Sequence, residues 1–172
     1  MSENQGREFE QAVKHSCDRQ GIFCFKLRDT YIPLQNINGA FAPKMISDFI
    51  MHRDGILYFV ECKTTKHKYI TFCREQTDKG MIAHHQWTQM YNVYNQQRPD
   101  VRCGLLLQYE NESNNPKTYY LPIENFVSFM NESDKKSLNP MDCVQHGAII
   151  VPNKMLIKHR AYDIKNTLGE VA

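Results

Sequence analysis

A β-hairpin is the sequence feature that most restricts how this chain can fold. Residues 45–51 and 56–60 are apolar runs of strand length, and the intervening Asp54-Gly55 is a strong signal for a two-residue turn. Such a turn sets the register of the two strands, so Asp48 is predicted to lie opposite Glu61. A shift by one residue would turn every side chain to the other face, so this register is a testable expectation.

The predicted register brings three charged residues together. Asp48 lies opposite Glu61, and Ile46 lies opposite Lys63 in the same register. Glu61 and Lys63 are two positions apart on one strand, so they share a face. Adjacent carboxylates raise each other's pKa, and a hard divalent cation between them relieves that repulsion. We interpret Asp48, Glu61 and Lys63 as a metal site; a surface ion pair between Lys63 and one carboxylate is the alternative.

The composition is that of an ordinary globular protein, and we expect residues 1–172 to form a single domain. Hydrophobic residues make up 41% and charged residues 23%, and the net charge of +2 does not by itself indicate a nucleic-acid partner. No apolar run approaches the about 20 residues of a membrane span. The six cysteines show neither a CxxC motif nor zinc-like spacing with histidine. We therefore expect free thiols and a cytoplasmic location.

The remaining chain alternates between helical and extended patterns. We expect helices over 2–20, 81–97, 122–131 and 139–145, and strands over 22–27, 69–72, 101–109, 117–121 and 148–151. The tail from Lys154 is rich in cations, and we expect it either to fray or to contact a polyanion. Its basic residues after Lys154 are Lys158, His159, Arg160 and Lys165.

The segment 30–44 has no predicted regular structure. It is long for a connector inside a compact domain, and such loops are usually functional or mobile. It has few charges and several apolar side chains. These features suit a partner surface, a bound ligand, or insertion against unstacked bases.

Other candidate residues flank the hairpin. Glu10 lies beside the buried stripe of the first helix, where it either reaches the carboxylates or is solvated. Gln86 lies beside the buried stripe of the helix predicted over 81–97. The neighbouring His84-His85 pair lacks the i, i+4 spacing of a helical zinc site, which argues against zinc. The strand exit after Lys63 suits phosphate contacts, or is a solvated strand end. Its candidate DNA-binding residues are Thr64, Thr65, Lys66 and Lys68.

These motifs, in this order, resemble a known nuclease core. The matching stretches are Gly6-x-x-x-Glu10, Ser47-Asp48-Phe49, Glu61-Cys62-Lys63-Thr64-Thr65, Ile70-Thr71-Phe72 and His85-Gln86. The set is similar to the PD-(D/E)XK nuclease superfamily and, within it, to RecU-type Holliday junction resolvases. The resemblance covers about the first two thirds of the chain. It implies an α/β restriction-endonuclease-like fold, in which helices flank a mixed central sheet.

The resemblance also implies roles for individual residues. Asp48 and Glu61 would be metal ligands, with the backbone carbonyl of Cys62 nearby. Lys63 would orient the attacking water and stabilise charge on the phosphate. Gln86 would position the site, and Glu10 matches an acidic position used by some resolvases. The implied cofactor is Mg²⁺, with Mn²⁺ as a substitute.

The same resemblance implies a substrate and a partner. Branched DNA would be bound by a homodimer whose two sites nick opposed strands of a four-way junction. Residues 30–44 would be a protruding stalk, with Arg28 and Lys44 near its ends as further DNA contacts. The expected function is therefore that of a metal-dependent, structure-selective endonuclease. The alternatives are a duplex-cutting endonuclease of the same superfamily and a catalytically silent DNA-binding module of the same fold.

Overall fold

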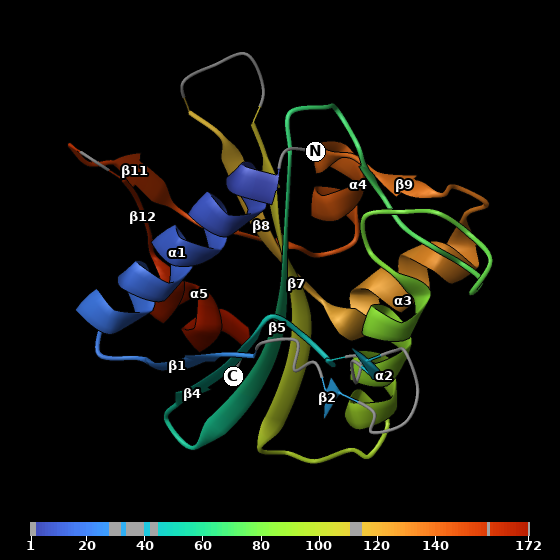
Figure 1. The fold of residues 1–172 in the computed structure, drawn as a ribbon, viewed down its shortest axis with the longest axis horizontal. Helices are drawn as coiled ribbons and strands as arrows, with labels where there is room; N and C mark the ends of the chain where they lie inside the picture. Colours follow the sequence, from blue (N-terminus) through green and yellow to red (C-terminus); the bar gives the residue numbers. More distant parts are fainter. Residues whose placement is uncertain are drawn as a thin grey trace.

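A six-stranded mixed sheet forms the centre of the computed structural model (Figure 1). The structure describes residues 3–27, 32–33, 40–41, 45–110, 115–157 and 159–171. In sheet order the strands are β1 (Phe23–Lys26), β4 (Phe49–Arg53), β5 (Ile56–Thr65), β7 (Val101–Tyr109), β8 (Lys117–Pro122) and β10 (Ile149–Ile150). Only β5 and β7 are parallel, and the other neighbours are antiparallel.

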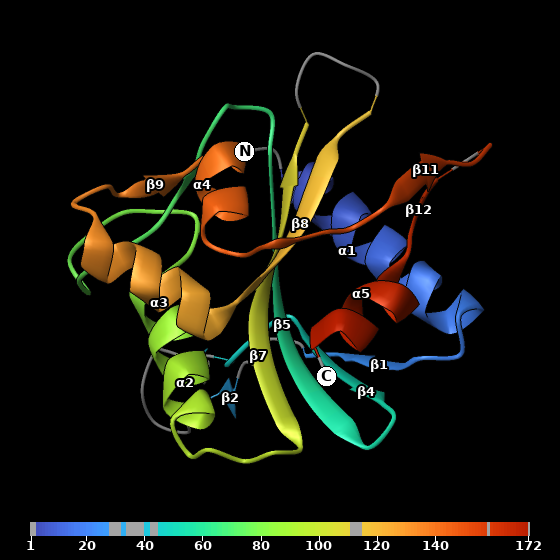
Figure 2. The ribbon, with the colours of Figure 1, turned by 180° about the vertical axis from the view of Figure 1, so that it is seen from behind.

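Helices cover both faces of this sheet (Figures 1 and 2). On one face lie α1 (Glu3–Arg19) and α5 (Ile164–Val171), whose buried residues share a core with β4 and β5. On the other face lie α2 (His84–Tyr94), α3 (Ile123–Glu132) and α4 (Pro140–Gln145), over a second core. This arrangement confirms an α/β fold with a mixed sheet between helical layers.

Three two-stranded sheets complete the described structure. They pair β2 (Ile32–Pro33) with β3 (Ala40–Phe41), β6 (Ile70–Thr71) with β9 (Ser137–Leu138), and β11 (Asn153–Met155) with β12 (Arg160–Tyr162). The rest of the proposed stalk, together with Arg28 and Lys44, lies outside the described residues. The stalk itself therefore stays a prediction.

The hairpin formed by β4 and β5 has the predicted register. Ile50 pairs with Phe59 and Arg53 pairs with Ile56. Both turn residues have positive φ angles, 50° at Asp54 and 83° at Gly55. A two-residue turn with two positive φ angles matches the right-handed twist of the flanking strands, which is why Asp-Gly is favoured there.

The first strand of this hairpin is shorter than expected. We predicted a strand from residue 45, but β4 begins at Phe49. Before that point the Asp48 carbonyl still accepts from the backbone N–H of Leu27 (2.8 Å), but side chains replace the backbone hydrogen bonds on the side of β5. The Ser47 hydroxyl donates to the Phe49 carbonyl (3.0 Å), and the Asp48 carboxylate accepts from the backbone N–H of Cys62 (2.8 Å). The β4–β5 ladder therefore stops where the Asp48 side chain binds Cys62.

The second helix also begins later than expected. We predicted it from residue 81, but α2 begins at His84. Ile82 instead donates its N–H to the Thr71 carbonyl (3.0 Å) and forms a bridge with Phe72. Ile82 is fully buried, so its apolar side chain fits the helical pattern while its backbone is extended.

Of the two alternatives for the C-terminal tail, fraying is wrong for the described residues. The tail forms the β11–β12 hairpin and α5, and it packs along α1. Tyr162, Ile164 and Leu168 are buried in the core beneath α1. Sequence patterns did not predict the β11–β12 hairpin, because each of its strands has only three residues and includes a charged one. Three residues are too few to show an alternation of apolar and polar side chains.

The cysteines and the helices bear on two further expectations. All six cysteines are free and buried, so they pack as small apolar groups. Within the described ranges, none of the helices combines the length and apolar character needed to cross a bilayer.

Candidate active site

The candidate site lies where β5 runs past the start of β4. Asp48 directly precedes β4, Glu61 and Lys63 belong to β5, and Gln86 lies in the first turn of α2. Glu61, at 1% side-chain exposure, forms an ion pair with Lys63. The structure thus brings together the hairpin residues and the helix glutamine that the sequence singled out.

Asp48 is half-buried and is tied to the adjacent strand. One carboxylate oxygen accepts a 2.8 Å hydrogen bond from the backbone N–H of Cys62. Burial raises the pKa of Asp48, and the Glu10 carboxylate adds to the rise, whereas Lys63 and the Cys62 amide oppose it. The net effect is upward, so the site holds this negative charge at a cost.

Glu61 is the most buried charge of the site. Its Oε1 accepts hydrogen bonds from Lys63 Nζ and Gln86 Nε2. Its Oε2 is buried and, with both carboxyls ionised, accepts no hydrogen bond from any of the described residues. Burial raises the pKa of Glu61 to about 7, and the charge of Lys63 and its hydrogen bond oppose this rise. The charge of Asp48 adds to the rise, as does the hydrogen bond that a protonated Glu61 makes with the Asp48 carboxylate. A buried carboxylate oxygen without a partner is unfavourable unless another group satisfies it.

Gln86 links this carboxylate to the start of α2. Its Oε1 accepts from the backbone N–H of Ala83 (2.9 Å), while its Nε2 donates to Glu61. The first contact satisfies one of the free N–H groups at the helix start. The side chain of Gln86 therefore caps the helix and fixes Glu61 at the same time.

Lys63 provides the positive charge of the site. Its side chain is 16% exposed. Burial lowers the pKa of Lys63, but the charges of Glu61 and Asp48 outweigh burial and leave it raised. Lys63 therefore stays protonated at neutral pH.

Glu10 approaches the site from the other face of the sheet. It forms an ion pair with Lys26 of β1, and its charge contributes to the raised pKa of Asp48. The sequence analysis missed Lys26. The alternation along β1 gave a usable signal, because it places Lys26 on the same face as Cys24, which packs under α1.

The donor set at Asp48 and Glu61 fits a hard divalent cation. Mg²⁺ is typically held by one or two carboxylates and keeps several waters. Two carboxylates are present, and Glu61 Oε2 is a buried oxygen in need of a partner. The Cys62 N–H points towards Asp48, and in an antiparallel pair the carbonyl of a residue points to the same edge as its N–H. The Cys62 thiol is buried with a raised pKa, so only its carbonyl suits this role.

The described residues contain no larger cluster of metal-binding side chains. Across them, no group of three or more His, Cys, Asp or Glu residues is placed to hold a metal ion. A cation at this position would depend on the two carboxylates, a backbone carbonyl and water.

The predicted DNA contacts after Lys63 divide into two groups. Thr64 donates to Gln108 Oε1 (3.0 Å), and Thr65 accepts from the backbone N–H of His67 (3.0 Å). Both threonines are buried, so their hydroxyls serve the fold. Lys66 and Lys68 are exposed and remain candidates for phosphate contacts.

Fold and site together define an α/β protein with a buried carboxylate–lysine cluster beside the central hairpin. No family model matches the chain. The chain is 27% identical over 133 residues to the SPbeta prophage-derived uncharacterized protein YotM of Bacillus subtilis (strain 168). The match covers 77% of this chain and 63% of that relative. The chain therefore aligns with less than two thirds of the relative's length.

Proposed function

We propose that the protein is a metal-dependent, structure-selective DNA endonuclease with a PD-(D/E)XK-type site, which resolves four-way junctions by paired nicking. The observation that carries the proposal is the buried, unpartnered Oε2 of Glu61 next to Asp48 and Lys63. An ion pair between Lys63 and Glu61 alone leaves that oxygen unsatisfied. A cation held between the two carboxylates would satisfy it.

Each residue of the site has a distinct task in this proposal. Asp48 and Glu61 would hold the cation, which activates water and neutralises charge on the phosphate when it is bound. Lys63 is a compact positive charge next to Glu61, where it can orient the nucleophile and stabilise the phosphate. Gln86 holds Glu61 Oε1 and so fixes which oxygen faces the cation.

The first test is cleavage of a four-way junction beside a matched linear duplex, with Mg²⁺ and with chelator. We expect cleavage only with Mg²⁺, and we expect Asp48→Asn to abolish it while DNA binding persists. Asp100→Asn is the matched control, since Asp100 is an exposed carboxylate paired with Arg98. Full activity of Asp48→Asn would refute the assignment.

The preference for junctions has separate support, which comes from the sequence resemblance. Replacing residues 34–39 by a short Gly-Ser turn should leave duplex binding in place and lower the preference for branched DNA. Competition binding between branched and linear DNA of equal length measures this preference. An unchanged preference would favour the duplex-cutting alternative, and binding without any cleavage would favour the silent module.

A further inference from the structure

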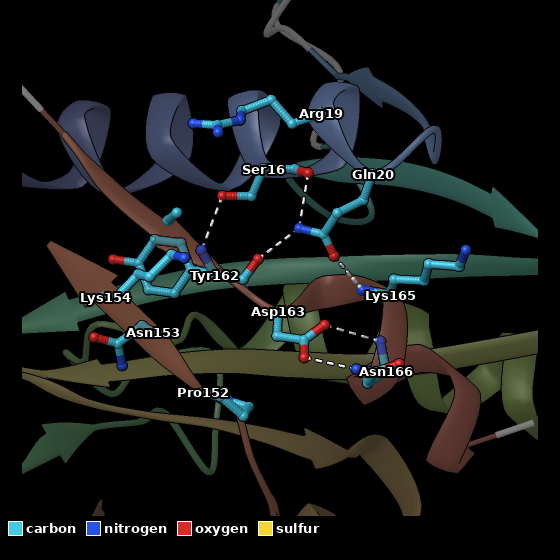
Figure 3. Close-up of a pocket in the computed structure, with 11 residues that line it drawn as sticks. Ser16, Arg19, Gln20, Pro152, Asn153, Lys154, Tyr162, Asp163, Lys165 and Asn166 are labelled. Carbon is cyan, nitrogen blue, oxygen red and sulfur yellow. Dashed lines mark hydrogen bonds between the residues drawn. The ribbon is translucent and has the colours of Figure 1, made fainter. Parts of the chain in front are cut away.

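A second polar site lies on the α1 face of the sheet, away from the carboxylates. A cavity of about 520 Å³ opens between the C-terminal half of α1, the β11–β12 hairpin and the start of α5 (Figure 3). Its lining includes three cations, each from a different element: Arg19 from α1, Lys154 from β11 and Lys165 from α5. Lys154 and Lys165 belong to the cationic C-terminal tail, for which the sequence analysis kept contact with a polyanion as an alternative.

The three cations are available to a ligand. All three are exposed, and in the described part of the chain none of their head groups has an ion pair or a hydrogen bond. Asp163 is the one carboxylate among the lining residues. Its oxygens accept from the backbone N–H (3.2 Å) and the side-chain amide (2.7 Å) of Asn166. The cavity therefore has an excess of uncompensated positive charge.

The wall behind the cations is held in place by hydrogen bonds. Gln20 Nε2 donates to the carbonyls of Ser16 (2.9 Å) and Tyr162 (2.6 Å), and its Oε1 accepts from the Lys165 N–H (2.7 Å). The Ser16 hydroxyl accepts from the Tyr162 N–H (3.0 Å). Figure 3 shows these contacts joining α1 to β12 and α5. The wall is thus organised before any ligand binds.

The same hydrogen bonds leave little with which to recognise a base. The amide groups of Gln20 and Asn153 are both used within the fold. The rings of Tyr162 and Phe9 pack edge to face, with their centroids 5.5 Å apart. Tyr162 is buried, so its ring offers no open face for stacking. Phosphate contacts need only cations and N–H groups, whereas base contacts need free donors, acceptors or ring faces.

We infer that this cavity binds phosphate groups of the DNA backbone at a distance from the cleaved bond. The inference rests on the proposed function, since it takes DNA as the substrate. Glu10 is the residue of α1 whose charge acts on Asp48, so it marks the end of α1 next to the site. Arg19 follows Glu10 by nine positions, which is about 14 Å along the helix axis. That span corresponds to about four base steps of a duplex strand. The cavity would hold the flanking duplex and set its direction across the protein.

The test is DNA binding as a function of salt, measured in chelator so that cleavage plays no part. The double variant Lys154→Gln/Lys165→Gln should lower the magnitude of the slope of log K against log salt by about two, because each lost phosphate contact lowers it by about one. Adding Arg19→Gln should lower it by about one more. The control Arg98→Gln/Lys136→Gln removes two exposed cations elsewhere and should keep the parental slope.

The outcomes separate this inference from the nuclease proposal. If the parent cuts DNA and the cavity variants keep its slope, the cavity inference fails alone. If the parent binds with a cavity-dependent slope but never cuts, the nuclease proposal fails alone. If the parent does not bind DNA even at low salt, both fail. A nucleoside monophosphate that competes much better than inorganic phosphate, and only in the parent, would overturn recognition of the backbone in favour of a nucleotide site.

Discussion

At the scale of the single residue, Glu61 bears the strongest electrostatic conflict of the proposed site. Its pKa rises from an ordinary 4.5 to about 7 in the fold. Its favourable contribution to stability is therefore complete below the ordinary value and is lost as pH rises through about 7. A glutamine at this position resembles the protonated acid at every pH.

We therefore expect Glu61→Gln to unfold at a higher temperature than the metal-free parent at about pH 8, and to match it at about pH 4. Each kcal/mol of stability is worth about 2–4 °C for a chain of this size. Thermal unfolding in chelator measures the difference, with the exposed Glu170→Gln as the control. A difference of the same size at both pH values would contradict the raised pKa.

Lys63 is expected to act on turnover rather than on metal binding. Lys63→Gln keeps a donor near Glu61 but removes the charge. We expect the activation free energy of the single-turnover reaction to rise by about 2–4 kcal/mol, as for other preorganised electrostatic groups. Metal affinity, measured by titration, should change little. Lys117→Gln removes an exposed lysine of β8, away from the site, and should cut at the parental rate. A near-parental rate for Lys63→Gln would leave Lys63 as an ordinary ion pair.

At the scale of the element, α2 depends on the same side chain that positions Glu61. Gln86→Met keeps the volume but removes the bonds to Ala83 and Glu61, so both stability and cleavage should fall. The loss of the hydrogen bond to Ala83 is worth about 1 kcal/mol, measured by urea unfolding. Gln86→Glu keeps the acceptor for the Ala83 N–H but adds a carboxyl beside Glu61. It should keep more stability than Gln86→Met and still cut poorly. If both variants cut normally, the site is confined to the hairpin.

The elements also show how far sequence patterns reach. The hairpin register was predictable because the turn residues Asp54 and Gly55 act locally on the backbone. The start of β4 was not, because the Asp48 side chain takes the place of a backbone partner for Cys62. The start of α2 was not, because Ile82 is buried in an extended backbone that pairs with residues from a separate strand. Each missed boundary depends on a tertiary contact that leaves no trace in local periodicity.

The candidate site divides in the same way. Alternation on one strand predicted that Glu61 and Lys63 share a face, and the structure pairs them. The burial of Thr64 could not be seen, since its hydroxyl partner Gln108 lies on β7. Nor could the role of Gln86 as a helix cap, because it depends on where α2 begins.

At the scale of the whole molecule, the core beneath α1 depends on α5. Leu168 is 1% exposed, and its carbonyl accepts from the Tyr58 hydroxyl (3.0 Å). Leu168→Ala should lower the free energy of unfolding by about 2–5 kcal/mol, the usual cost of a cavity in a core. Ile157→Ala changes a fully exposed residue of the nearby hairpin and should have almost no effect in the same urea titration. Equal effects would mean that α5 is not part of the cooperative core.

The hydrogen bonds of Gln20 also have a consequence for the order of synthesis. They join α1 to residues that follow 142 and 145 positions later in the chain. The chain is synthesised at about 5–20 residues per second, so one side of α1 stays without its partners for roughly 7–28 s. Ser16 and Gln20 make this exposed side of α1 partly polar. A partly polar surface associates less readily with other nascent chains than an apolar one during that time.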